Sequence, residues 1–300
     1  REHACVYYAS DEGSRVEEFT AAAHGRDMHV QARLALDENG GFLALDADVV
    51  GDMGAYLSGN APNIATRSFT TAMGGIYKIN AIHMTAKGAF TNTGCVDAYR
   101  GAGKPEANFL IERLIDAAAA RCGFDPLELR RKNAIESFPH RTAFGMDLDG
   151  GRFGQNVTRA GHMAGYQDFS VRRDEAAADG QLRGIGIGCF LETARGNPSE
   201  GAEVRFLASG DIEVCLGTES NGQGHETTFT QLAAHFFGVD GERIRYVQAD
   251  TDKTRMGHGH GGARSMHMGG GALSAAMDDA ITKGRKVAAQ MLQADVEKVS

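Results

Sequence analysis

The chain has 300 residues, of which 42% are hydrophobic, so it can bury a substantial core, and two compact units are the default expectation. Its formal net charge of -8 disfavours nucleic acid and anionic membranes as partners, because both bind clustered Lys and Arg side chains. No apolar run approaches the roughly 20 residues that cross a bilayer, and no apolar signal core follows the polar start, so we expect a soluble, cytoplasmic protein.

The two ends of the chain indicate a piece of something longer. The chain begins with Arg1 rather than Met, and its last helical pattern runs to Ser300 without a stop signal. We therefore expect a fragment of a longer subunit.

The first half is predicted to contain one hairpin and two helices. Residues 31–36 and 41–50 carry β-like apolar positions, and the Asn-Gly pair at 39–40 suits the positive φ of a hairpin turn. Residues 105–123 repeat apolar side chains at helical spacing, from a first-turn proline to a glycine that can close the helix. Residues 125–133 begin with an Asp cap, a Pro and a reciprocal Glu, which predict a short second helix.

In the second half, the apolar pattern first fades and then returns. The weak pattern at 136–182 predicts the connection between two units, with room for a helix around 166–178. Residues 202–207 and 212–216 repeat the hairpin pattern, and residues 229–238 predict an amphipathic helix closed by a glycine.

Hairpins recur without the regular rhythm of a parallel doubly wound sheet. We therefore predict the α+β class, with mixed, hairpin-rich sheets packed against helices. We expect the chain to divide into parts of two subdomains, at 1–160 and 161–300.

Three turn-rich segments, each leading into a predicted helix, are the candidates for binding chemistry. They span residues 91–106, 217–225 and 257–271. Main-chain amides at a helix start bind anions, and glycines let a bulky ligand approach the main chain. Glycine-rich turns before helices are common, so each segment alone is weak support for a cofactor site. Their occurrence together in one chain strengthens that interpretation.

The third segment leaves another interpretation open. His258, His260 and His267 could form a zinc or copper site, although alternating histidines in a glycine loop need a carboxylate or Cys partner. GxSxG, HExxH, Walker-type and CxxC motifs are absent, which removes the usual support for hydrolase, zinc protease and nucleoside-triphosphatase functions.

The cysteines are odd in number and far apart in the sequence. This spacing predicts neither a disulfide framework nor a Cys metal site, and we expect most of them to be buried thiols. The five are Cys5, Cys95, Cys122, Cys189 and Cys215.

Together and in this order, the three segments resemble the molybdopterin-binding large subunit of the molybdenum hydroxylases. This superfamily includes xanthine dehydrogenase, aldehyde oxidase and the large chain of aerobic carbon monoxide dehydrogenase. The likeness runs from about Arg15 to the end of the chain. It rests on VDAYRGAG at 96–103, GQGHET at 222–227 and GGARS at 261–265, with GRD at 25–27 in support.

The resemblance implies a molybdenum cofactor, in bacteria commonly molybdopterin cytosine dinucleotide. It implies an iron-sulfur small subunit and a FAD medium subunit as partners, which carry 2Fe-2S clusters and FAD. The implied reaction is hydroxylation of a small-molecule substrate, an aldehyde or an N-heteroaromatic compound, with water as the oxygen source. The family's catalytic glutamate lies outside this segment, so we expect the fragment to be inactive alone.

The resemblance also implies roles for individual residues. Arg100 is expected beside the metal as a catalytic residue, and no side chain here is expected to ligate the metal. The other motif positions are expected to bind the cofactor: Tyr99, Gly101, Ala102, Gly222, Gln223, Gly224, His225, Gly261, Gly262, Ala263, Arg264 and Ser265.

Some positions depart from the family pattern. Carbon monoxide dehydrogenases carry a copper-binding Cys after the Tyr-Arg pair, whereas this chain has Gly101, so CO oxidation is not expected. His260 and Ala263 stand where relatives usually have hydroxyl side chains, and Lys104 where they often have Arg. The alternative from another class is a noncatalytic scaffold or assembly fragment that binds no cofactor.

Overall fold

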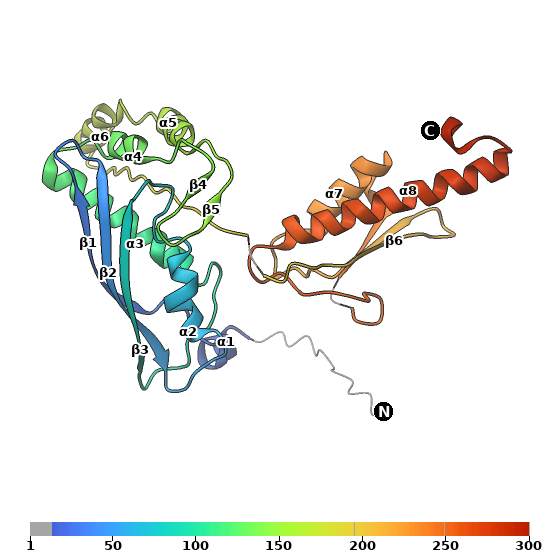
Figure 1. Ribbon diagram of the computed structural model, residues 1–300, viewed down its shortest axis with the longest axis horizontal. Helices are drawn as coiled ribbons and strands as arrows, with labels where there is room; N and C mark the ends of the chain where they lie inside the picture. Colours follow the sequence, from blue (N-terminus) through green and yellow to red (C-terminus); the bar gives the residue numbers. More distant parts are fainter. Residues whose placement is uncertain (1–13, 195, 249, 300) are drawn as a thin grey trace. The chain divides into compact units, whose positions relative to one another are not determined.

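The computed structural model describes residues 14–194, 196–248 and 250–299. They form two compact units, an N-terminal unit that ends at Glu192 and a C-terminal unit that begins at Thr193 (Figure 1). The predicted boundary between two cofactor-binding subdomains, after residue 160, stays a prediction. The compact N-terminal unit extends beyond that residue, because it includes α5 (Phe153–Met163) and α6 (Phe169–Ala178).

An antiparallel hairpin and a third, parallel strand form the sheet of the N-terminal unit. β1 (Met28–Leu36) pairs antiparallel with β2 (Phe42–Gly54), and β2 pairs parallel with β3 (Ala81–Phe90). The predicted hairpin is confirmed, and Gly40 in its turn has a left-handed φ of 82°. β3 was not predicted, because it joins β2 only after a long crossover.

The crossover and the short elements around this sheet are helical. They are α1 (Arg15–Ala21) before β1, and α2 (Ala61–Asn63) followed by the π-helical turn η1 (Ile64–Ser68) between β2 and β3.

One face of the sheet packs against α3 (Lys104–Cys122) (Figure 1). Val49 of β2 and Ile111 and Ile115 of α3 are at most 1% exposed and lie in one hydrophobic cluster. Full burial of a side chain of this size stabilises the fold by about 1.5–3 kcal/mol. The predicted helix end is confirmed, because Gly123 closes α3 with a φ of 76°.

The second predicted helix is α4 (Pro126–Asn133). Asp125 caps it by accepting hydrogen bonds from the main-chain amides of Leu127 and Glu128, at 2.8 and 2.9 Å. The reciprocal contact predicted for Glu128 is wrong. Its carboxylate instead accepts from Arg131 at 2.5–2.8 Å, one turn further along the helix.

The region at 136–182, predicted as a connection, is folded instead. The helix expected around 166–178 is present, but the other three elements were missed. The four elements are β4 (His140–Arg141), β5 (Asp147–Leu148), α5 (Phe153–Met163) and α6 (Phe169–Ala178). Between α6 and β6, the described residues 179–194 and 196–201 form neither helix nor strand.

The C-terminal unit repeats the hairpin with an added parallel strand. β6 (Ala202–Phe206) pairs antiparallel with β7 (Ile212–Leu216), as predicted, and β7 pairs parallel with β8 (Ile244–Gln248). The helical elements are α7 (His225–Phe237), η2 (Gly241–Arg243), η3 (Ser265–Gly270), α8 (Gly271–Leu292) and η4 (Val296–Lys298).

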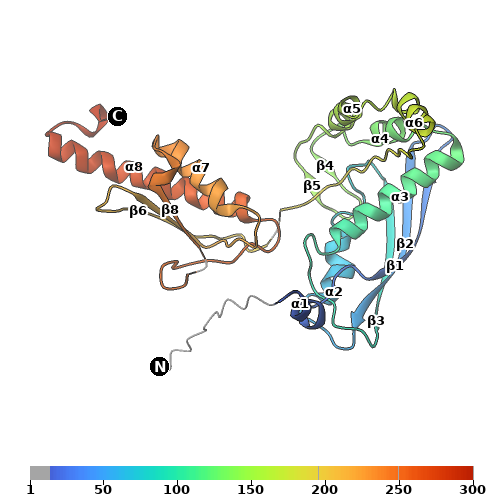
Figure 2. The same cartoon turned by 180° about the vertical axis from the view of Figure 1, so that it is seen from behind.

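Both long helices of this unit contribute to one core. Figures 1 and 2 show α7 and α8 beside the strands of this unit. Phe229 of α7 and Leu273 and Met277 of α8 are at most 1% exposed and cluster with residues of β7. The predicted helix end at Gly238 is confirmed. The helical pattern expected to run to Ser300 is wrong, because α8 stops at Leu292 and Gln293 turns left-handed at φ 48°. Ser300 itself lies outside the described residues.

The two units share one order of elements: hairpin, helical crossover, parallel third strand, loop, long helix. The loop before the long helix carries the first candidate segment in the N-terminal unit and the third in the C-terminal unit. The predicted α+β class with mixed sheets is confirmed.

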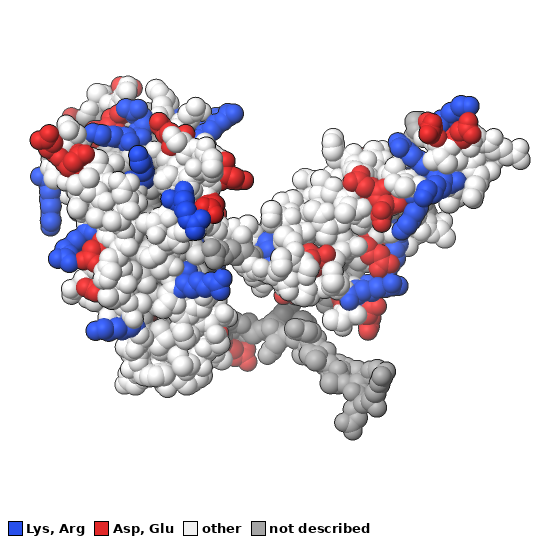
Figure 3. Space-filling model, viewed as in Figure 1, with Lys and Arg blue, Asp and Glu red and all other residues white. Residues whose placement is uncertain are grey.

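The described surface shows how charges and thiols are distributed. On the face in Figure 3, acidic and basic side chains are interspersed over both units, without a continuous basic patch among the described residues. Cys215 is buried, Cys95 and Cys189 are intermediate and Cys122 is exposed, so the expectation of mostly buried thiols is wrong for these four. Cys5 lies outside the described residues. No described helix is long and apolar enough to span a membrane.

Candidate functional site

The first segment forms a tight left-handed loop at the start of α3. Gly101, Ala102 and Gly103 have φ values of 90°, 42° and 92°. The loop is closed by hydrogen bonds from the amide of Ala102 to the carbonyl of Tyr99 at 2.7 Å and from Lys104 to Gly101 at 3.2 Å. A Cβ on Gly103 would overlap the carbonyl oxygen of Ile64, so the loop lies directly on the crossover helix.

Arg100 projects from this loop toward solvent. Its side chain is exposed, and within the described residues its guanidinium makes no hydrogen bond. Its main-chain carbonyl accepts a hydrogen bond from Arg26, whose guanidinium also lies 4.8 Å from the ring centre of Tyr99. The loop therefore presents a cation that is available to a ligand.

The second segment precedes α7 in the C-terminal unit. Gly222 and Gly224 take left-handed φ values of 98° and 82°, and Gly224 is the N-cap of the helix. Between them, the side-chain oxygen of Gln223 accepts from the amide of Asn221 and from the hydroxyl of Ser220 at 3.2 Å. A Cβ on either glycine would meet nothing within 4 Å, so the main chain is open to approach here.

His225 begins α7 as a buried ring. It is 7% exposed, packs edge-on against Phe229 at 5.5 Å between ring centres, and its Nδ1 has no hydrogen-bond partner among the described residues. Burial lowers the pKa of His225, and the charge of His260 adds to this effect. Both effects favour the neutral form of the ring.

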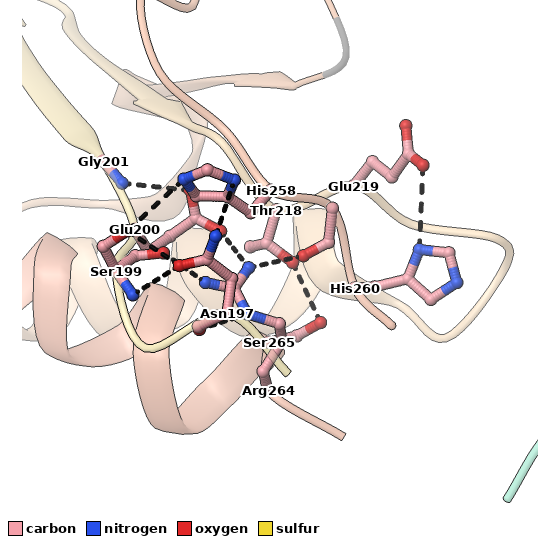
Figure 4. Close-up of polar contacts among 11 residues, drawn as sticks. Asn197, Ser199, Glu200, Gly201, Thr218, Glu219, His258, His260, Arg264 and Ser265 are labelled. Carbon is pink, nitrogen blue, oxygen red and sulfur yellow. Dashed lines mark hydrogen bonds and ion pairs between the residues drawn. The ribbon is translucent and has the colours of Figure 1, made fainter. Parts of the chain in front are cut away.

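The third segment is anchored by Arg264, which is 1% exposed (Figure 4). Its guanidinium pairs with the fully buried carboxylate of Glu200 and donates to the carbonyls of Gly259 at 2.7 Å, Ser199 at 2.5 Å and Asn197 at 3.1 Å. All of these partners are protein groups. The structure therefore places the Arg264 side chain inside the protein, where it orders the loop.

The remaining residues of this segment differ in their contacts and backbone conformation. Ser265 accepts a hydrogen bond at 2.9 Å from the hydroxyl of Thr218, which is 0% exposed. Gly262 and Ala263 are left-handed, at φ 99° and 58°. Gly261 is not left-handed, and a Cβ there would meet nothing within 4 Å.

The three histidines considered as a metal site do not gather. His258 is engaged at both ring nitrogens, by Asn197 at 3.1 Å and Ser199 at 3.3 Å, and His260 lies 3.7 Å from Glu219 (Figure 4). His267 is on η3. Across the described ranges, no group of three His, Cys, Asp or Glu side chains could hold a metal ion. The zinc or copper interpretation has no support from this geometry.

The structure brings the second and third segments together within the C-terminal unit and keeps the first in the N-terminal unit. The links include the Thr218–Ser265 hydrogen bond, the 3.7 Å contact of His260 with Glu219 and the close approach of Gly217 and Gly257. Sequence reasoning gave no role to Arg26, Glu200 or Thr218. Arg26 lies in the GRD motif and so carried a signal, whereas nothing in the sequence marked Glu200.

Family models match both parts of the chain. Residues 12–134 and 159–300 each match a model described as a molybdopterin cofactor-binding domain. The large chain of carbon monoxide dehydrogenase from Hydrogenophaga pseudoflava is 33% identical over 298 residues, which is 93% of this chain and 37% of that protein. Subunit gamma of the 6-hydroxypseudooxynicotine dehydrogenase complex from Paenarthrobacter nicotinovorans is 30% identical over 288 residues, 94% of this chain and 36% of that protein.

A solved structure shows the same fold. Quinoline 2-oxidoreductase from Pseudomonas putida 86 is similar with a TM-score of 0.85 and 29% identity, over 95% of this chain and 38% of that chain. This chain thus spans little more than a third of the curated relatives it matches, 37% and 36% of the two named above. From the two matched regions and these likenesses, we conclude that the chain belongs to the molybdopterin cofactor-binding domains of the molybdenum hydroxylase large subunits.

Proposed function

We propose that this chain is the cofactor-binding portion of an oxidoreductase that hydroxylates an aldehyde or an N-heteroaromatic compound with water as the oxygen source. The name of quinoline 2-oxidoreductase supports the second of these substrate classes, because quinoline is an N-heteroaromatic compound. The proposed cofactor is molybdopterin cytosine dinucleotide. The proposed partners are an iron-sulfur subunit and a FAD subunit, and the two units are proposed to be two cofactor-binding subdomains.

The observation that carries the proposal is the open main chain at Gly261. Most glycines of the three segments are explained by the chain itself, since Gly262, for example, is left-handed and Gly217 touches neighbouring main chain. Gly261 has neither reason: it is not left-handed, and a Cβ would meet no atom within 4 Å. A group from outside the protein that approaches the main chain closely, such as a pterin or a pyrophosphate, explains the glycine.

The residues present fit such a group. The amides that begin α7 and the left-handed turn at Gly262 and Ala263 offer donors for phosphate and pterin edges. Arg264 and Glu200 hold the second of these turns in place, and Thr218 fixes Ser265. When bound, the cofactor supplies the two-electron oxidising centre that the protein side chains lack.

Arg100 is the proposed catalytic residue of this chain. Its exposed guanidinium has free donors within the described residues, so it can hold a substrate oxygen or another anionic group by charge-assisted hydrogen bonds. Gly101 beside it has no thiol, and its φ of 90° disfavours any side chain. We therefore propose a hydroxylase of organic substrates rather than an enzyme that oxidises CO through copper.

The test is a measurement of cofactor content in the full-length subunit within its complex. We expect about one molybdenum and one released CMP per large subunit, measured by elemental analysis and nucleotide chromatography. Gly261→Ala is expected to lower both about fivefold or more without changing the melting temperature of the cofactor-free protein, since bound cofactor itself stabilises the fold. The matched control is Gly284→Ala in α8, where a Cβ also meets nothing within 4 Å.

Two results would contradict the proposal. Equal molybdenum and CMP in wild type and Gly261→Ala would remove the role of the open main chain. Absence of both after expression in a cofactor-competent host would favour the noncatalytic scaffold.

A further inference from the structure

The GRD segment lies beneath the Arg100 loop. His24 donates its amide to the carbonyl of Cys95 at 2.9 Å, and Asp97 donates back to His24 at 2.8 Å, so the two segments run side by side. A Cβ on Gly25 would lie 2.8 Å from the Cβ of Tyr99. Gly25 therefore lies so close to Tyr99 that there is no room for a side chain between them.

A single guanidinium makes three contacts at this point. Arg26 donates to the main-chain carbonyl of Arg100, forms an ion pair with Glu106 at 3.2 Å, and lies over the ring of Tyr99 at 4.8 Å. The side chains of Arg26 and Glu106 are 31% and 12% exposed, so the pair is screened less than a surface pair. Because Glu106 is in the first turn of α3, the contacts tie the loop to a rigid helix.

Arg26 also has an unfavourable backbone conformation. Its φ of 59° is left-handed, which a non-glycine residue with a long side chain adopts rarely. Such conformations persist where surrounding contacts determine them, and they concentrate at functional sites. Within the described residues, Arg26 is the side chain that hydrogen-bonds the main chain of Arg100.

We propose that Arg26 is a positioning residue for Arg100: it fixes the carbonyl of Arg100 and the ring of Tyr99, and thereby the direction in which the Arg100 guanidinium projects. The inference rests on the catalytic role proposed above for Arg100. A catalytic group needs its supporting contacts to hold it within a fraction of an ångström of the productive geometry. Release of the loop would leave Arg100 present but misdirected.

The first test measures how often the loop opens. Trypsin cuts after Arg100 only when the Arg100–Gly101 bond leaves its folded conformation, so the cutting rate reports opening. With the full-length subunit in its complex, Arg26→Gln is expected to raise this rate about tenfold, measured by mass spectrometry. Arg26→Lys is expected to give an intermediate rate, because an ammonium keeps the charge without the planar fork. Cutting after Arg113, within α3 of the same unit, reports unfolding of that unit and should not change.

Arg172 provides a matched control. Its guanidinium also donates to main-chain carbonyls, those of Ala164 at 2.7 Å and Gly165 at 2.5 Å, and lies 5.6 Å from the ring centre of Phe169. Arg172→Gln makes the same chemical change away from the loop and should leave the rate after Arg100 unchanged. Equal rates in wild type and Arg26→Gln would overturn the proposal. A wild-type rate in Arg26→Lys would overturn the role of the guanidinium fork.

The second test asks whether Arg26 acts through Arg100. Arg26→Gln and Arg100→Gln are each expected to lower kcat/KM, with molybdenum content unchanged, and the double variant should lose little more than Arg100→Gln alone. Losses that multiply would overturn the positioning role, because a general structural effect is independent of Arg100. If Arg100→Gln keeps full activity, the proposed catalytic role of Arg100 fails, while the cutting rates still decide whether Arg26 holds the loop.

Discussion

Glu200 and Arg264 form an ion pair in which the two side chains are 0% and 1% exposed. The partners come from the segment before β6 and from the loop before η3, so the pair joins two stretches of chain that are far apart in sequence. Each buried charge is stabilised by its partner, because water cannot reach either group to replace that partner.

Glu200→Gln is expected to lower the free energy of unfolding by about 3 kcal/mol, because it leaves the Arg264 cation buried without a counter-charge. Denaturant unfolding of the chain measures the loss. The control is Asp174→Asn, which breaks an exposed pair with Arg173 and should change stability by no more than about 0.5 kcal/mol. A similar small change for both variants would contradict the prediction.

His225 predicts a pH dependence of stability. Burial holds its pKa below the ordinary value, so as the pH falls through about 6.5 the unfolded chain binds a proton that the folded chain does not. The free energy of unfolding should therefore fall toward acid pH. His225→Gln should remove up to about 1.4 kcal/mol per pH unit of that slope. Urea unfolding between about pH 7.5 and 5.5 measures it, and identical slopes in the two proteins would refute the prediction.

A comparison of Gly103 with Gly123 distinguishes backbone strain from steric overlap as the cost of adding a side chain. Both are left-handed, at φ 92° and 76°, but only Gly103 has a neighbour, the carbonyl of Ile64, in the place of a Cβ. Gly123→Ala should cost about 1 kcal/mol from the backbone alone. Gly103→Ala should cost about 2–3 kcal/mol more, because the loop must move off the crossover helix. Thermal unfolding of the two variants compares them directly, and equal melting temperatures would contradict the clash.

Gly101→Cys tests whether glycine at this position serves the fold. A Cβ there would lie 2.6 Å from Cγ of Pro105, and the φ of 90° disfavours a side chain. We expect a loss of about 1–3 kcal/mol in denaturant unfolding. Pro105→Ala in the same chain should restore the part that comes from the contact. If Gly101→Cys is as stable as wild type, the loop tolerates a side chain and this explanation is wrong.

Elements whose signals are local could be predicted from the sequence. Both hairpins, α3, α4 and α7 are defined by turn residues, caps and spacing within a few residues, and each is present. β3 and β8 could not be recognised in this way, because each pairs in parallel with a strand that lies before a helical crossover. α5 was missed because its large apolar contacts are few: Phe153 and Val157 pack toward the core, whereas Gly161 lies against Leu127 without a side chain of its own.

In the candidate site, too, local features could be predicted from the sequence and long-range contacts could not. The sequence marks the loops as glycine-rich, but it does not tell a glycine that the fold requires, such as Gly103, from one with open space beside it, such as Gly261. Nor does it show that Arg264 points into the protein, because its partners include carbonyls that any residue type could supply.

The close approach of Gly217 and Gly257 has a consequence for engineering. A Cβ on Gly257 would overlap the main chain of Gly217, so the loop that follows Gly257 begins at a fixed point. The loop ends at a second fixed point, where Arg264 pairs with Glu200. The stretch at 258–263 is therefore held at both ends. Libraries confined to His258 and His260, where the main chain requires no glycine, should keep both attachment points and the fold, whereas Gly259 and Gly262 need their left-handed backbone.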